Sequence, residues 1–188
     1  LDEHFHRQIH NINQSQFKSK FFDVVIPMTG NKCVGLISAF EEQPIYLNSK
    51  FGPFSIVTNG LVENIPVLTT ELLKKGISFS EVRAGSINPT ELVAKLITQG
   101  DDLIDGIENM FQKIEGAMSL LLLNKDGVWA IRDRYSHWPL IIGQSNDAWA
   151  VITETSSFPN IGDVNHGIIM RMNPTPDRLK MCRNETFF

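Results

Sequence analysis

The stretch AMSLLLLNKDGVWAIR, residues 117–132, decides the fold class of this chain. It opens with a largely apolar run, Ala117–Leu123, and continues through Asn124–Gly127, a typical turn sequence. A second apolar segment, Val128–Arg132, follows the turn. Continuous apolar runs are typical of strands that are covered on both faces. The stretch therefore predicts two antiparallel strands inside a layered domain.

Three helices are predicted upstream of these strands. The best signalled begins after Asn88, a suitable N-cap residue, with Pro89 in its first position and Glu91 at the capping-box position. Of the other two, one begins after Asn64, which is expected to cap it, and ends at Gly76, and the other runs from Asp101 to Ile114. At helical spacing, the three apolar stripes comprise Leu68, Leu72 and Leu73, then Leu92, Val93, Leu96 and Ile97, then Leu103, Ile107, Met110, Phe111 and Ile114.

Further strands are predicted on both sides of this region. They are Cys33–Ser38, Phe54–Thr58 (followed by Asn59-Gly60 as a turn), Leu140–Gly143, Ala148–Thr153 and Ile168–Met172. The order predicts one α+β domain over residues 1–188, with helices packed on largely antiparallel sheets. Residues 1–21 are expected to be an atypical, polar start, and residues 173–188 an exit segment.

The composition excludes several classes of protein. The net charge is -4 and no block of like charge exceeds three residues, which argues against a nucleic-acid binder. The longest apolar run is too short to span a bilayer, and no secretory signal opens the chain. Two cysteines, Cys33 and Cys182, make neither a disulfide framework nor a four-ligand zinc site. We expect a cytoplasmic protein without a cofactor, a nucleic-acid partner or a membrane partner.

Asn59-Gly60 is the most suggestive polar pair. The Asn59 side-chain amide and the Gly60 backbone N–H could together hold a developing oxyanion. On these two residues alone, however, a simple Asn-Gly turn is the favoured interpretation. Cys33 lies in an apolar stretch without a neighbouring base, which indicates a core residue rather than a nucleophile.

The loop Arg132–Trp138 is the second candidate site. It contains Arg132, Asp133 and His137, which could bind a ligand or partner; alternatively, an Arg–Asp pair holds an ordered turn. His6 and His10 have the spacing of metal ligands on one helical face, but without a third ligand they are expected to be solvated. No metal site is expected.

Several pieces of the sequence resemble the glutaminase domain of amidophosphoribosyltransferases, which are class II glutamine amidotransferases. The pieces follow the family's order and spacing: QP at 43–44, FSIVTNGLVEN at 54–64, IEGAMSL at 114–120, RD at 132–133, PLIIG at 139–143, AVITET at 150–155, NIG at 160–162 and HGI at 166–168. The resemblance implies a four-layer αββα sandwich of mostly antiparallel sheets, the N-terminal-nucleophile hydrolase fold. It also implies that an N-terminal cysteine hydrolyses glutamine. The ammonia released from glutamine then goes to a transferase domain that acts in purine biosynthesis.

The family's site residues carry over only in part. Asn59 and Gly60 match its oxyanion-hole pair, whereas Leu1 stands where the resemblance would expect the nucleophilic cysteine. Gly35 replaces the arginine that binds the glutamine carboxylate, and Pro89 replaces the aspartate that binds the glutamine amine. In the loop 132–138, Ser136 and Trp138 replace a glycine and an arginine.

Three hypotheses follow. The first is a degenerate domain with a structural, regulatory or interaction role, joined to a transferase domain or to further copies of itself and binding a glutamine-like molecule weakly. The second is an active glutaminase whose cysteine segment precedes Leu1. The third is the same fold with changed chemistry, centred on the loop 132–138.

Overall fold

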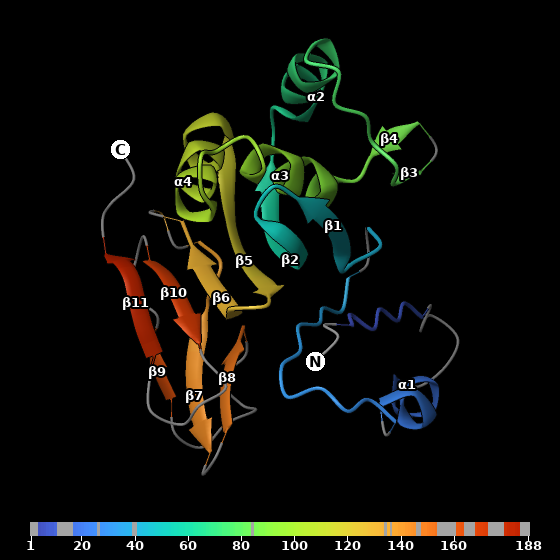
Figure 1. The fold of residues 1–188 in the computed structure, drawn as a ribbon, viewed down its shortest axis with the longest axis vertical. Coiled ribbons are helices and arrows are strands. Elements are labelled where there is room, and N and C mark those ends of the chain that lie inside the picture. Colours follow the sequence, from blue (N-terminus) through green and yellow to red (C-terminus); the bar gives the residue numbers. More distant parts are fainter. Residues whose placement is uncertain are drawn as a thin grey trace.

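The computed structural model describes residues 4–10, 17–25, 27–38, 41–83, 85–133, 135, 137–145, 148–153, 161–163, 168–172 and 179–184. Its main element is a six-stranded sheet with the strand order β1-β2-β5-β6-β10-β11 (Figure 1). All neighbouring strands are antiparallel. The strands are β1 (Ile45–Ser49), β2 (Gly52–Val62), β5 (Gly116–Asn124), β6 (Gly127–Arg132), β10 (Ile168–Met172) and β11 (Leu179–Asn184).

The predicted central hairpin is confirmed as β5 and β6. Leu121 lies opposite Ala130, and Asn124 lies opposite Gly127 at the turn. The Asn124 side-chain oxygen accepts hydrogen bonds from the Asp126 backbone and from the Trp129 indole N–H. Asn124, the first residue of the predicted turn, therefore closes the turn through its side chain.

The three predicted helices are also confirmed, as α2 (Ile65–Lys74), α3 (Pro89–Ile97) and α4 (Leu103–Lys113). Asn88 caps α3 through its side-chain oxygen, which accepts from the backbone N–H groups of Thr90 and Glu91. Helices α3 and α4 cover one face of the six-stranded sheet (Figure 1). The core between them includes the buried side chains of Ile56, Leu92, Val93, Leu96, Ile97, Ile107, Met110, Leu120, Leu122 and Ile131.

A second antiparallel sheet, β8-β7-β9, packs on the opposite face. It comprises β7 (Ile141–Ser145), β8 (Ala148–Ile152) and β9 (Ile161–Asp163). Leu121 and Ala130 of the large sheet cluster with Leu140, Ile142 and Val151 of the small one. The helices, the large sheet and the small sheet thus form successive layers. This arrangement confirms the predicted α+β class with largely antiparallel sheets.

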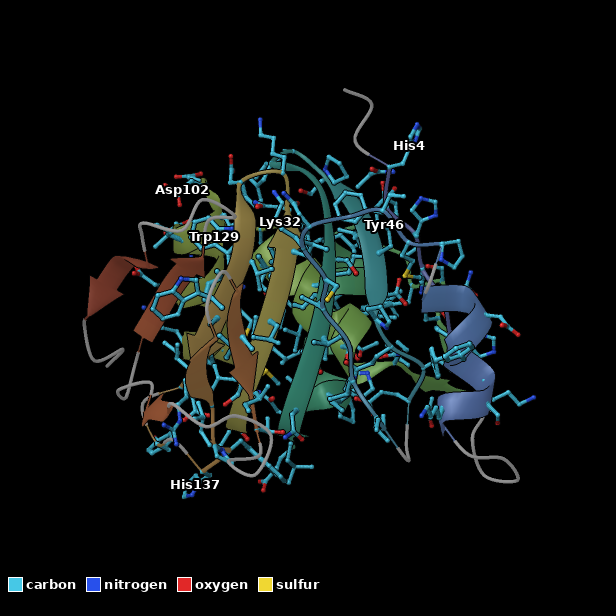
Figure 2. The ribbon with its side chains drawn as sticks, turned by 90° about the horizontal axis from the view of Figure 1, so that it is seen from below. His4, Lys32, Tyr46, Asp102, Trp129 and His137 are labelled. Atoms are coloured by element: carbon cyan, nitrogen blue, oxygen red, sulfur yellow. The ribbon has the colours of Figure 1, made fainter. Side chains whose placement is uncertain are left out.

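Two smaller elements complete the described chain. Helix α1 (Phe17–Val25), which was not predicted, lies beyond the β1 edge and away from β7 and β8 (Figures 1 and 2). The short hairpin of β3 (Val82–Arg83) and β4 (Ser86–Ile87) lies next to the start of α3. No helix among the described residues has both the length and the apolar character that a membrane crossing requires.

One predicted strand and one predicted turn were wrong. Cys33–Ser38 forms no strand: Cys33 is exposed and Ile37 is 70% exposed, because this apolar run lies on the surface instead of pairing in a sheet. Figure 2 shows Lys32 of the same segment close to the β5–β6 turn, where its ammonium donates to the Lys125 carbonyl. Asn59-Gly60 is not a turn, because β5 continues opposite it and keeps it in β2.

Three further expectations are corrected. The exit segment contains β11, which pairs with β10 and extends the sheet. Leu73, expected in the apolar face of α2, is 53% exposed, because that helix buries only Leu68 and Leu72. Residues 4–10 are not helical, so the spacing of His6 and His10 does not bring them to one helical face.

Candidate functional site

The two candidate sites of the sequence meet on one row of the large sheet. Asn59 in β2 lies opposite Ser119 in β5, and Ser119 lies opposite Arg132 in β6. Because paired residues share a face and alternate residues of a strand do too, the row faces the small sheet, as Leu121 and Ala130 do. The fold therefore places the predicted oxyanion residue and the first loop residue on the same surface.

The loop 132–138 folds back over this row. The Trp138 carbonyl oxygen accepts a hydrogen bond from Ser119 Oγ at 2.9 Å and another from Arg132 Nε at 3.1 Å. Ser119 is 2% exposed, so its hydroxyl needs such a partner. Two of the three polar groups in the row thus hold the loop backbone in place.

Asp133 anchors the loop from inside. It is 4% exposed, and its carboxylate accepts from the backbone N–H groups of Met118 and Tyr135. These bonds to the main chain shape the turn, and the expected Arg–Asp pair stays a prediction. His137 is exposed, stacks on Tyr135 with ring centroids 6.0 Å apart, and points away from the ribbon in Figure 2. Arg134 and Ser136 lie outside the described residues.

Gly60 is required by the close approach of two strands. Its φ is +153°, and a Cβ atom there would lie 2.3 Å from the Ala117 carbonyl oxygen. No side chain fits at that distance, so the residue type follows from packing against β5. The oxyanion role of Asn59 and Gly60 remains a prediction.

Gly35 and Pro89, the two substituted positions, have different surroundings. A Cβ atom on Gly35 would meet nothing within 4 Å, so space is not the reason for glycine there. Pro89 is the first residue of α3 and lies in the wall of a cavity of about 870 Å³. The cavity lies between the starts of α2 and α3, the β3–β4 hairpin and the segment before β1.

This cavity is lined by both acidic and apolar residues. Glu41, Glu42 and Glu81 contribute the carboxylates. The apolar lining residues are Ile65, Pro66, Val82, Ile87 and Pro89. The sequence did not single out the three glutamates, because they come from two separate segments and form no motif.

Glu91 fixes the edge of the cavity. It is 1% exposed, and its carboxylate accepts from the backbone N–H groups of Ser80 and Glu81 and from the Ser80 hydroxyl. The backbone N–H of Asn88, which a capping box would give to Glu91, donates to the Glu81 carbonyl instead. Glu91 therefore links residues 80–81, which precede β3, to helix α3.

The described residues contain no group of three or more His, Cys, Asp or Glu side chains arranged to hold a metal ion. The candidate site comprises the sheet row, the loop and the cavity. Its described residues offer carboxylates, hydroxyls, backbone N–H groups, the Asn59 amide, the Arg132 guanidinium and the His137 imidazole.

The comparisons with known proteins agree with this fold. The profile of the glutamine amidotransferase domain matches residues 34–160. The amidophosphoribosyltransferase of Methanocaldococcus jannaschii is 35% identical over 102 residues, which cover 54% of this chain and 21% of the relative. The human amidophosphoribosyltransferase is 27% identical over 143 residues, which cover 64% of this chain and 27% of the relative.

Solved structures match as well. The glutamine phosphoribosylpyrophosphate amidotransferase of B. subtilis, complexed with ADP and GMP, superposes with a TM-score of 0.65 at 25% identity, over 79% of this chain and 32% of its own. This chain therefore spans about a fifth to a third of the length of these relatives. Since the profile covers most of the chain and the fold agrees, the chain belongs to the glutamine amidotransferase domain family.

Proposed function

We propose that this domain does not hydrolyse glutamine and has a structural, regulatory or interaction role in a transferase-like protein. The observation that carries the proposal is the cavity beside Pro89, which has three glutamates and no basic side chain among the described residues that line it. A glutamine molecule brings an α-carboxylate, which such a lining repels. Arg7 pairs with one of the three, Glu81, at 3.4 Å.

The two substituted positions support the same conclusion. Recognition of an amino acid depends on charged partners for its ammonium and its carboxylate, and Arg is suited to the carboxylate because it binds with two hydrogen bonds. Gly35 has no side chain, and the ring of Pro89 has no charge. Both positions lie inside the chain, so the argument does not depend on what precedes Leu1.

Active glutamine hydrolysis is the second candidate. Asn59 and Gly60 favour it, since the pair that resembles the family's oxyanion hole sits in an ordered strand. A cysteine upstream of Leu1 would then act as nucleophile, and the ammonia would pass to a transferase, as the names of the relatives suggest. The same fold with changed chemistry, centred on the loop 132–138, is the third.

A glutaminase assay on the full-length protein tests the proposal. We expect glutamate release from millimolar glutamine at the uncatalysed rate, for the wild type and for Asn59→Ala alike. Glutamate release by the wild type that falls by about 10²–10³-fold in Asn59→Ala would overturn the proposal, because loss of one oxyanion donor has that effect in an active enzyme.

A further inference from the structure

We propose that residues 4–7, here called the strap, cover the open edge of the large sheet and keep β1 from pairing with β1 of a second copy of this chain. The proposal goes beyond the proposed function, because it concerns a sheet edge rather than the candidate site. β1 is the last strand on its side of the six-stranded sheet, and β2 is its only neighbour among the described strands. Figure 2 shows His4 and Tyr46 together at this edge.

The backbone of β1 has hydrogen-bonding groups that point away from the sheet. Ser49 and Gly52 close a two-residue turn, so the odd-numbered residues of β1 are the ones whose backbone groups bond to β2. Tyr46 and Asn48 therefore direct their N–H and C=O groups outward. No residue in the described part of the chain forms a hydrogen bond with these groups. An open edge of this kind is a template for another strand.

The strand itself lacks the features that usually block such an edge. Its sequence, IYLNS, contains no charged residue, no proline and no glycine. Its register with β2 runs without a bulge from Ile45 to Ser49. Since lysines, prolines and bulges are the common means of preventing edge-to-edge pairing, protection of β1 falls to another part of the chain.

The strap lies against β1 in antiparallel order. The Phe5 ring packs on the Tyr46 ring with centroids 5.2 Å apart, and Arg7 Nε donates to the Pro44 carbonyl at 2.6 Å. Two residues forward along the strap thus correspond to two residues backward at β1, which is the direction of a paired antiparallel strand. Between the strap and β1, the described residues form no backbone–backbone hydrogen bond. The strap flanks the edge as an added strand would, but without the ladder.

The contacts that hold the strap are side-chain contacts at the surface. Besides its bond to Pro44, Arg7 pairs with Glu81 at 3.4 Å, and both of these side chains are 34% exposed. Exposed ion pairs contribute little to stability and weaken as salt is added. A segment held in this way detaches far more easily than the sheet unfolds. The strap is therefore a releasable cover.

A second copy is the partner that this edge fits. Two identical strands related by a two-fold axis are antiparallel, and antiparallel is the direction that the strap already takes along β1. With Leu47 at the axis, Tyr46 of one copy lies opposite Asn48 of the other, and their outward N–H and C=O groups satisfy one another. Because β1 is uncharged, it does not repel its copy. One short strand from each copy takes part, so we expect a weak dimer.

Analytical ultracentrifugation of the full-length protein tests the proposal. We expect the average mass of the wild type to be independent of protein concentration. Phe5→Ala with Arg7→Ala releases the strap, and the mass of this double variant should rise with concentration toward twice that of the wild type. His6→Ala, at an exposed residue of the strap, is the matched control and should behave as the wild type. Adding Asn48→Lys to the double variant should abolish the rise, whereas adding Asn48→Gln should preserve it.

Amide hydrogen exchange locates the contact. In the double variant, the Tyr46 and Asn48 amides should exchange about tenfold or more slowly at high than at low protein concentration. A mass of the double variant that does not change with concentration would overturn the proposal. A rise that Asn48→Lys leaves intact would overturn it as well, because the copies would then associate through another surface. Neither measurement involves glutamine, so a failure here is distinct from a failure of the proposed function.

Discussion

Thr58 and Thr90 share a buried hydrogen bond between their hydroxyl oxygens, which lie 2.5 Å apart. It joins β2 to the first turn of α3, and both residues are almost fully buried, at 6% and 0% exposed. The next residue after Thr58 is Asn59, and the residue before Thr90 is Pro89. This contact therefore links the strand of the predicted oxyanion pair to the helix that begins at the acidic cavity.

A double-mutant cycle measures this contact. Thr90→Val should destabilise the protein by about 1–3 kcal/mol, because it leaves the buried Thr58 hydroxyl without this partner. Thr58→Val combined with Thr90→Val should recover part of the loss, since both polar groups are then gone. Urea denaturation gives the free energies of unfolding. Thr70→Val, on the exposed side of α2, serves as control, and strictly additive effects at 58 and 90 would show that the hydroxyls do not interact.

Gly60→Ala tests the close approach of β2 and β5. The new Cβ would lie 2.3 Å from a backbone oxygen at a φ that L residues rarely adopt. We expect a loss of at least about 2 kcal/mol in the free energy of unfolding. Gly35→Ala is the matched control, because its Cβ meets open space, and it should change stability by less than about 1 kcal/mol. Equal effects of the two substitutions would contradict the packing account.

Glu91→Gln tests the tie between α3 and residues 80–81. The amide keeps one acceptor oxygen but places an NH₂ group against backbone donors that the second carboxylate oxygen now satisfies. We expect a loss of about 1–3 kcal/mol in thermal or urea unfolding. Hydrogen exchange at the Ser80 and Glu81 amides should accelerate as well. Glu115→Gln, at an exposed residue, is the control, and unchanged exchange at 80–81 would count against the tie.

Local signals were enough to predict much of this fold. Asn88 with Pro89, and Asn124 with Gly127, act on neighbouring backbone groups, so helix α3 and the β5–β6 hairpin follow from a few adjacent residues. Each makes its decisive hydrogen bonds within the segment itself. These elements were therefore predictable without knowledge of the remainder of the chain.

Contacts between distant segments were not predictable in the same way. Asn59-Gly60 has a turn sequence, yet β5 pairs with it and keeps it extended. Asn64 was expected to cap α2, but its side chain instead bridges the Lys113 carbonyl and the Glu115 N–H beyond α4. The cavity lining includes Glu41 and Glu42 together with Glu81, and only the fold brings those residues together.

The ion pair on α2 predicts a specific pH dependence. The pKa of the Glu71 carboxyl lies below its usual range, first because Lys75 donates a hydrogen bond at 2.7 Å, and then because the Lys113 charge is near. A carboxyl with a lowered folded pKa stabilises the protein above its unfolded pKa, and this contribution disappears as pH falls through the folded pKa. NMR titration of the Glu71 carboxyl should show the pKa rising in Lys75→Met and rising less in Lys113→Met. Lys125→Met should leave it unchanged, and high salt should reduce the effect.

Restoring the family's arginine at position 35 and aspartate at position 89 tests whether their loss prevents glutamine binding. In Gly35→Arg with Pro89→Asp, the arginine enters open space, and the aspartate stands in the first turn of α3, where an acidic residue suits the helix dipole. We expect calorimetric glutamine binding that is about tenfold or more tighter than in the wild type, because both charged ends of the ligand gain a partner. Gly35→Lys with Pro89→Asp is the matched control, since an ammonium cannot bind a carboxylate through two parallel hydrogen bonds and should restore less. Wild-type affinity equal to that of the double variant would mean that Gly35 and Pro89 are not what separates this domain from a glutamine site.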